Sequence, residues 1–277
     1  MGRSKVLFAW LMVGYAFLYI PICSLVFYSF NKSKLVTVWG GFSTRWYSEV
    51  LNNDAIMSAA WLSLKIAFIS SSVATIFGTL AGYVMVRWAP FRGGLLFSGM
   101  ITAPLVMPVI ITGISLLLLF VSLEQLIGWP ASRGVTTVTI AHITFSMAFV
   151  AVIIQSRLAN MDLSIEEAAM DLGSRPVKVF FTITVPMIFP AIMTGWLLAF
   201  TLSIDDLVIS SFVSGPNATT LPMLVFSKIR LGVAPDVNAL ASIMILIVSV
   251  SVIGAFWFSS VNQRKQEKIT THIKKNP

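Results

Sequence analysis

Long apolar stretches alternate with short polar segments along the chain, and six of the stretches are long enough to cross a bilayer as helices. A transmembrane helix needs about 20 apolar residues, because the hydrocarbon core of a membrane is roughly 30 Å thick. The predicted spans are residues 6–30, 60–86, 95–121, 135–154, 189–212 and 239–261. Since proline interrupts helical hydrogen bonding, Pro21 should bend the first span, and Pro104 and Pro108 the third. The pattern predicts an all-α membrane protein with six transmembrane helices, forming a single transmembrane domain over residues 1–277.

The second predicted span carries Ala74, Gly78 and Gly82 at four-residue spacing. Small residues at this spacing allow two helix backbones to approach closely inside a bilayer. We therefore predict a helix-packing face here. The alternative is that some of these residues, with the neighbouring serines and threonines, line a translocation path.

Composition supports the membrane class. The chain is 57% hydrophobic and 11% charged, whereas soluble domains carry roughly 25% charged residues. The net charge is +8, but the basic residues sit at the ends of apolar runs instead of on one face, which disfavours nucleic-acid binding. The basic tail, residues 262–277, is expected to be attracted to anionic membrane lipid. Cys23 is the single cysteine, so an intrachain disulfide is excluded.

The distribution of basic residues predicts the orientation. If the N-terminus lies inside, twelve of the 19 Lys and Arg residues fall in inner segments and six in outer segments. An excess of Lys and Arg marks the cytoplasmic side of a membrane protein. Both termini are therefore expected to be cytoplasmic, as is the segment between the fourth and fifth spans.

That segment, residues 157–188, is mostly polar and is predicted to form an elbow of two short helices. Ser164 with Glu167 three residues later predicts a capping box at the start of the first helix. Gly173 is the expected stop of this helix, and Pro176 fits the first turn of the second. An exposed elbow of this kind is suited to docking a soluble partner.

The elbow resembles the EAA motif, E-A-A-x3-G-x9-I-x-L-P, of the transmembrane subunits of binding-protein-dependent ABC importers. The matching positions are Glu167, Ala168, Ala169, Gly173, Ile183, Val185 and Pro186, with Val185 in place of the usual Leu. The resemblance implies a type I ABC importer permease fold, whose cytoplasmic coupling helix seats in a groove of an ATPase subunit. The implied coupling residues are Glu166, Glu167, Ala168, Ala169, Gly173, Ile183 and Pro186. Glu167 would fix the elbow and Gly173 would permit its turn; the alternative is an interfacial hairpin that merely links two spans.

Two adjacent acids, Asp205 and Asp206, lie inside the fifth predicted span. An aspartate near the centre of a membrane helix costs about 2.5–3.5 kcal/mol on insertion scales, so it is a functional hypothesis by default. One interpretation is an acidic lining for a cationic substrate. The other is a structural ion pair, with Lys65 as a candidate partner.

The segment around these acids, SIDDLVISSFVSGPNATTLPMLVFSKIR, resembles the polyamine branch of the importer family, whose members include putrescine permeases. The run TAPLVMPVIITGISLLLLF in the third span does too. The resemblance implies a small cationic cargo and a substrate path that includes Asp205, Asp206, Pro104 and Pro108. That branch often has an acid directly after the second of these prolines, where this chain has Val109.

No G-x4-G-K-[ST] phosphate loop occurs in the sequence, so the chain is not expected to be an enzyme that hydrolyses ATP, nor to hold a cofactor itself. His142 has no Cys or His at metal-ligand spacing, which favours a buried, hydrogen-bonded histidine over a metal site.

The resemblance further implies the partners: a homologous permease subunit, two ABC ATPase subunits that bind ATP and Mg²⁺, and a periplasmic or lipid-anchored binding protein. It places the chain in the bacterial cytoplasmic (inner) membrane. Two rival hypotheses stay open: a proton-coupled secondary transporter that uses Asp205 or Asp206, and a membrane scaffold that transports nothing.

Overall fold

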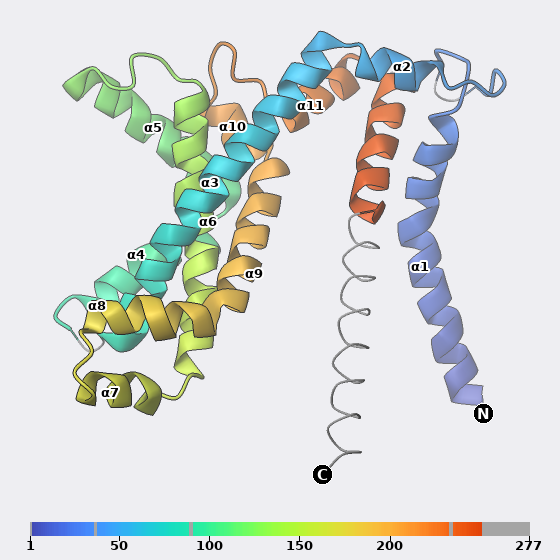
Figure 1. Cartoon of the computed structure of the whole chain (residues 1–277). Helices are drawn as coiled ribbons and strands as arrows, with labels where there is room; N and C mark the ends of the chain where they lie inside the picture. The colour runs from blue at the N-terminus through green and yellow to red at the C-terminus, as the bar shows by residue number, and fades with distance from the viewer. Residues whose placement is uncertain (1, 36–37, 89–90, 233–234, 251–277) are drawn as a thin grey trace. The chain divides into compact units, whose positions relative to one another are not determined.

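The computed structural model describes residues 2–35, 38–88, 91–232 and 235–250. Helices dominate these residues (Figure 1). In chain order they are α1 (Gly2–Tyr28), α2 (Arg45–Leu51), α3 (Asp54–Arg87), α4 (Gly94–Val106), α5 (Val109–Ile127), α6 (Val135–Ala159), α7 (Ser164–Asp171), α8 (Pro176–Val179), the π-helix η1 (Phe180–Thr184), α9 (Val185–Ile204), α10 (Val208–Val213) and α11 (Leu221–Leu231), followed by a helix over Pro235–Val250.

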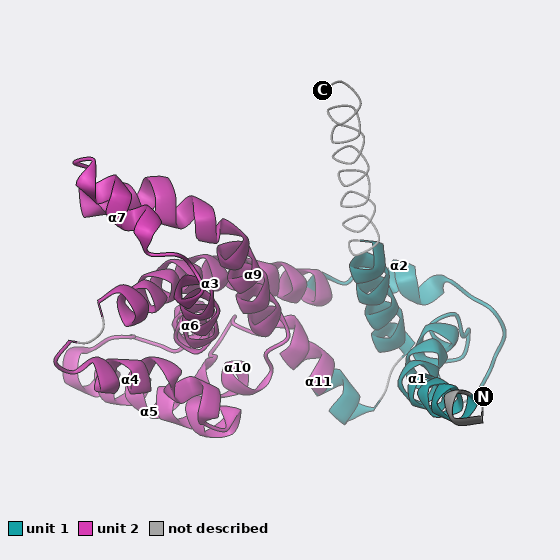
Figure 2. Ribbon diagram, turned by 90° about the horizontal axis from the view of Figure 1, so that it is seen from below, with its two compact units in different colours: residues 1–54, 227–277 teal, residues 55–226 magenta. Residues whose placement is uncertain are grey.

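The chain divides into two compact units, one formed by residues 1–54 with 227–277 and the other by residues 55–226 (Figure 2). In the first unit, Trp46 of α2 is buried and its indole N–H donates to the Asn31 carbonyl at 2.6 Å. An isolated antiparallel bridge joins Asn31 to Phe42. The second unit contains the elbow and both intramembrane acids.

Five helices in the described part of the chain are long and apolar enough to cross a membrane, which confirms the all-α membrane class. They are Lys5–Tyr28, Asp54–Arg87, Val109–Ile127, Val135–Ala159 and Pro176–Ile204, and two shorter apolar helices cover Gly94–Val106 and Pro235–Val250. The last of these begins the sixth predicted span; residues 251–261 of that span and the basic tail lie outside the described residues.

The prediction of one helix over residues 95–121 is wrong. The chain forms two helices there, because Met107 is extended (φ −75°, ψ 137°) and α5 starts directly after Pro108. A proline ring disfavours the helical conformation of the residue before it and provides no amide hydrogen. Pro104, in contrast, stays inside α4.

The prediction of one span over residues 189–212 is also wrong at both ends. The helix already begins at Pro176, passes through η1, and ends at Ile204. The π-helix lies immediately before Pro186, where the missing proline N–H disturbs the regular hydrogen-bond pattern. Residues 208–213 form the separate helix α10.

The small residues of α3 form the predicted packing face. A Cβ atom added at Gly78 would lie 2.7 Å from Cβ of Val150 on α6, and one at Gly82 would lie 2.8 Å from the Ala151 carbonyl oxygen. Both contacts are closer than real Cβ atoms allow, so α3 and α6 meet backbone to backbone at this point.

The serines that follow on α3 bond to their own helix. The hydroxyl of Ser70 donates to the Ala67 carbonyl at 3.3 Å. Ser71 and Ser72 both donate to the Phe68 carbonyl, at 3.1 and 2.7 Å. These bonds satisfy the hydroxyls without a neighbouring helix.

We expect Gly82→Ala to lower the free energy of unfolding by about 1–3 kcal/mol, because the added methyl group meets a backbone oxygen that cannot move aside. Denaturation of the purified chain in mixed micelles measures the change. Gly99→Ala is the matched control, since nothing lies within 4 Å of a Cβ at that position of α4. Equal stabilities of the two variants would contradict the close approach of α3 and α6.

Candidate functional site: a polar helix break and a buried ion pair

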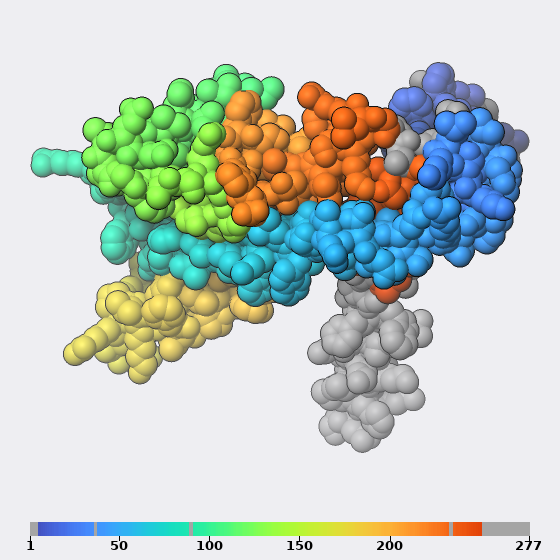
Figure 3. Space-filling view, turned by 90° about the horizontal axis from the view of Figure 1, so that it is seen from above, coloured from blue at the N-terminus to red at the C-terminus, as the bar shows by residue number. Residues whose placement is uncertain are grey.

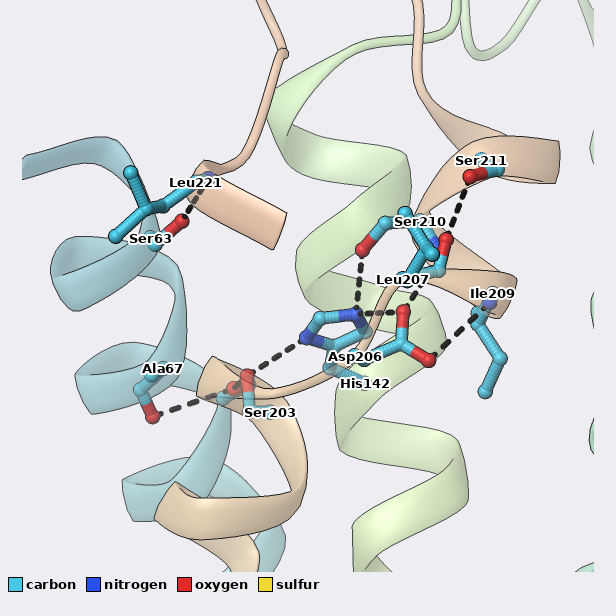
Figure 4. A network of polar contacts seen from close by, with 11 residues as sticks. Ser63, Ala67, His142, Ser203, Asp206, Leu207, Ile209, Ser210, Ser211 and Leu221 are labelled. Carbon is cyan, nitrogen blue, oxygen red and sulfur yellow. Dashed lines mark hydrogen bonds and ion pairs between the residues drawn. The ribbon is translucent and has the colours of Figure 1, made fainter. Parts of the chain in front are cut away.

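The helix that contains the fifth predicted span stops at Ile204, and Asp206 holds the chain where it restarts (Figure 4). The first amide groups of a helix have no partner within the helix. The Asp206 carboxylate accepts the Ile209 N–H at 3.2 Å and the Ser210 N–H at 2.7 Å. Asp206 therefore caps α10.

His142 of α6 connects this cap to two other helices. Its side chain is 2% exposed, and Nε2 lies 3.2 Å from Oδ2 of Asp206 and 3.1 Å from the Ser210 hydroxyl. Nδ1 lies 2.6 Å from the Ser203 hydroxyl, which in turn lies 2.9 Å from the Ser70 hydroxyl on α3. These five residues, Ser70, His142, Ser203, Asp206 and Ser210, form what we call the break network.

The break network confirms the predicted buried, hydrogen-bonded histidine. A carboxylate only accepts hydrogen bonds, so the contact with Asp206 assigns the proton to Nε2 of His142. Nδ1 of the neutral ring then accepts the Ser203 hydroxyl proton, and Ser203 can accept from Ser70. Every member of the network has a partner, as a polar cluster in an apolar environment requires.

The two adjacent acids have different surroundings. Asp206 is bound by His142, so the prediction of Lys65 as its partner is wrong; Lys65 is exposed and lines a separate surface pocket with Trp61 and Asn217. Asp205 is exposed, and its carboxylate takes part in none of the hydrogen bonds or ion pairs found among the described residues. The helix ends between the positions predicted to share one span, because Asp206 caps the next helix instead of continuing α9.

The two prolines predicted to line the path also differ. Pro104 is half-buried within α4, whereas Pro108 is exposed directly before α5. The start of α5 lies against α10, since a Cβ atom at Gly113 would sit 2.7 Å from the Phe212 ring. Pro108 thus belongs to a helix that contacts the segment capped by Asp206.

At the other end of this unit, α7 ends at Gly173 as predicted. The glycine has φ +86°, a left-handed conformation that side chains disfavour. Its N–H donates to the Met170 carbonyl at 2.9 Å, and the Ser174 N–H donates to the Ala169 carbonyl at 3.1 Å. This pair of bonds is a Schellman motif. Pro176 is the first residue of α8, also as predicted.

The capping box predicted at Ser164 and Glu167 is absent from α7. Ser164 already lies in the helix, and its N–H donates to Oδ1 of Asp162 at 3.0 Å. This bond, helped by one from the Ser164 side chain, holds the pKa of Asp162 below its usual range. Asp162 starts the elbow because its short side chain reaches the backbone two residues ahead.

Glu166, and not Glu167, fixes the elbow to the rest of the unit. Its Oε2 lies 2.9 Å from Nε of Arg87, the last residue of α3, and its Oε1 lies 3.4 Å from the Arg87 Nη2. The hydroxyl of Thr184 in η1 donates to Oε1 at 2.7 Å. We call Arg87, Glu166 and Thr184 the clamp. The sequence reasoning missed Arg87 and Thr184, since Arg87 lies 79 positions from Glu166 and no local pattern joins them.

The remaining residues of the motif face outward to different degrees. The elbow protrudes from the unit (yellow in Figure 3), with α7 at its tip (Figure 1). Leu172 is 89% exposed. Exposed motif residues are Glu167, Ala168, Gly173 and Pro186, whereas Ala169 and Ile183 are half-buried.

The helical fold, the protruding elbow and the polar break together define a membrane-embedded transport component. Residues 74–268 match the family described as "Binding-protein-dependent transport system inner membrane component", and the chain belongs to this family. It is 61% identical over 257 residues to the "Putrescine transport system permease protein PotI" of Escherichia coli (strain K12), covering 92% of this chain and 91% of the relative. It is 42% identical over 241 residues to the "Spermidine/putrescine transport system permease protein PotC" of the same strain, covering 87% and 89%.

Solved structures confirm the fold. A chain of a bacterial ABC transporter involved in the import of the acidic polysaccharide alginate superimposes with a TM-score of 0.72 at 15% identity, covering 92% of this chain and 96% of that chain. An amino acid ABC transporter crystallised with histidines gives a TM-score of 0.53 at 19% identity, covering 76% and 96%. The expected ABC importer permease fold is therefore correct.

We expect Asp206→Ala to destabilise the chain by about 2–3 kcal/mol, because it removes a helix cap and leaves the buried His142 without its acceptor. Asp206→Asn should lose less, since an amide oxygen can still accept an amide hydrogen of α10. Unfolding of the purified variants in micelles measures the difference. Asp205→Ala is the control for stability, and a similar loss in that variant would contradict the roles assigned to the two acids.

Proposed function

We propose that this chain is one half of the membrane pathway of an ATP-driven importer, and that its cargo is a small cationic polyamine, with putrescine favoured. The observation that carries the proposal is the 61% identity, over 92% of the chain, to a putrescine permease. Resemblance at this level over nearly the whole chain supports a shared cargo as well as a shared fold.

The chain would act with subunits that it lacks. A homologous permease would complete the pathway, two ATPase subunits would bind ATP and Mg²⁺, and a periplasmic or lipid-anchored binding protein would deliver the cargo. Membership of a binding-protein-dependent family supports this assembly, and so does the lack of a phosphate-loop motif in the sequence. With both termini cytoplasmic, as the basic residues favour, the elbow projects into the cytoplasm.

The elbow is the proposed contact with an ATPase subunit. Glu167, Ala168 and Leu172 are exposed on it and offer a charge, a small surface for close approach and an apolar side chain. Closure of the ATPases on ATP would draw the two elbows of the transporter together and open the pathway outward. ATP release would reverse the movement, giving alternating access.

Asp205 is the proposed contact for the cationic cargo. Its carboxylate is exposed and follows the last turn of α9, where the helix dipole is also negative. An ammonium group would be attracted by both. Asp206 has a different task in this proposal, because its oxygens already hold α10 and His142.

The rival hypotheses receive less support. A proton-coupled transporter would work without a binding protein, whereas the family is defined by dependence on one. A scaffold that transports nothing, or an elbow that only links two spans, leaves the relation to permeases without an explanation.

The deciding experiment is to purify the chain from its native membrane, identify the attached subunits, and measure putrescine binding to the soluble one. Reconstituted in vesicles, the complete complex should take up labelled putrescine only with ATP and the binding protein. Uptake by the isolated chain, driven by a proton gradient without ATP, would overturn the proposal.

We expect Gly173→Val to insert normally and to leave ATP hydrolysis running, while putrescine uptake per ATP falls about tenfold, because a β-branched residue cannot keep φ at +86° in the elbow. Paired hydrolysis and uptake assays measure the ratio. Gly128→Val is the matched control, since Gly128 has φ +70° at the end of α5 and lies outside the elbow. Normal uptake by Gly173→Val would contradict the coupling role.

We expect Asp205→Asn to reduce putrescine uptake about tenfold at low substrate, which corresponds to the loss of one charged contact of about 1.4 kcal/mol. Its thermal stability should not change, since the carboxylate has no described partner inside the chain. Initial rates at several putrescine concentrations test this. Unchanged uptake would remove Asp205 from the substrate path.

A further inference from the structure

The clamp joins three elements that are distant in sequence. Arg87 ends α3, Glu166 belongs to α7, and Thr184 ends η1, directly before α9. All three side chains converge on one carboxylate, at 2.9 Å from Nε of Arg87 and 2.7 Å from the Thr184 hydroxyl. Glu166 is therefore the single group through which α7 contacts the ends of both long helices.

The ion pair of the clamp is almost closed to solvent. The side chains of Arg87 and Glu166 are 9% and 5% exposed, whereas those of the surface pair Arg45 and Glu49 are 59% and 42% exposed. Separating a buried pair leaves each charge without compensation, while a surface pair can separate with little effect. The elbow cannot leave the end of α3 without exposing both charges of the clamp.

The neighbouring acids of the elbow divide in the same way as those of the helix break. Glu166 is buried against Arg87, and Glu167 is exposed. Successive residues of a helix project about 100° apart, so one acid faces the long helices while the other stays available to a partner. A force applied at the exposed face is then carried by the buried face.

The clamp also connects the elbow to the break network. At about 1.5 Å per residue, about 26 Å of α3 separates Arg87 from Ser70, whose hydroxyl contacts Ser203 at the end of α9. Thr184 lies where the continuous helix Pro176–Ile204 has π-helical hydrogen bonding, the point at which such a helix is least regular. The clamp thus holds both helices that lead from the elbow to Asp206.

We propose that Arg87 and Glu166 are positioning residues for ATP-coupled transport: their buried ion pair makes α7 and α3 move as one body, so that movement of the elbow reaches the helix break. The inference rests on the proposed docking of the elbow to an ATPase. It assigns a role to Arg87, a residue outside the EAA pattern, and separates that role from ATPase contact at Glu167.

The test uses the complete reconstituted transporter and compares ATP hydrolysis with putrescine uptake. Glu166→Gln keeps the side-chain shape and removes the charge. We expect the complex to assemble and hydrolyse ATP while uptake per ATP falls about fivefold or more, the lower range of coupling between sites. The double variant Arg87→Glu/Glu166→Arg should regain part of the ratio. The control, Arg45→Gln/Glu49→Gln, removes an exposed pair of the same residue types and should leave it unchanged.

A role that is only structural predicts a different result. Hydrolysis and uptake would then fall in proportion, with the amount of assembled complex, and the unchanged ratio would overturn the proposal. If Glu166→Gln does not assemble, Arg87→Lys provides the measurement, because lysine keeps the charge but loses the second contact with the carboxylate. A normal ratio in Arg87→Lys would also overturn it.

Failure of this inference can be told from failure of the proposed function. Normal ratios in the clamp variants, together with uncoupling by Gly173→Val, would remove the clamp and leave elbow coupling standing. Normal coupling by Gly173→Val would remove the elbow as the ATPase contact, whatever the clamp variants do.

Discussion

A helix that stops in an apolar environment leaves amide and carbonyl groups that water cannot reach, and this constraint organises the second unit. The chain interrupts α9 and restarts at α10, which requires an acceptor for the new amide groups. Asp206 supplies it, and His142 stabilises that carboxylate in turn. Because His142 is itself bound by Ser203, the interruption recruits side chains from several helices. One of two adjacent acids is thereby committed to structure, which leaves Asp205 exposed beside it.

The same arrangement appears at the opposite end of the unit, where α7 lies remote from α10 (Figure 1). There Glu166 is satisfied by Arg87 and Thr184, and Glu167 faces outward. Both polar clusters draw on the same helices, since α3 contributes to each and the continuous helix from Pro176 to Ile204 runs between them. Close packing of α3 on α6 adds a rigid contact between the two ends. The unit is therefore held by two satisfied charge clusters joined by packed helices.

The sequence predicted what depends on local chemistry. Gly173 ends α7 because left-handed backbone favours glycine, and the small residues of α3 pack closely because they have no bulk. It did not predict what depends on facing. Nothing local distinguishes Glu166 from Glu167, or Pro104 inside α4 from Pro108 at its end. The break at Asp205 and Asp206 was missed for a related reason: the apolar run continues through it, and the groups that stabilise the break come from other helices.

The serine run of α3 has a consequence for biosynthesis. A nascent helix that enters lipid before its neighbours are made must satisfy its polar groups alone. The hydroxyls of Ser70, Ser71 and Ser72 can do so, because each donates to a carbonyl of its own helix. The Asp206 carboxylate and the His142 ring have no equivalent escape. The order of translation therefore places the tolerant segment first, and the demanding residues arrive when a partner for them already waits in the bilayer.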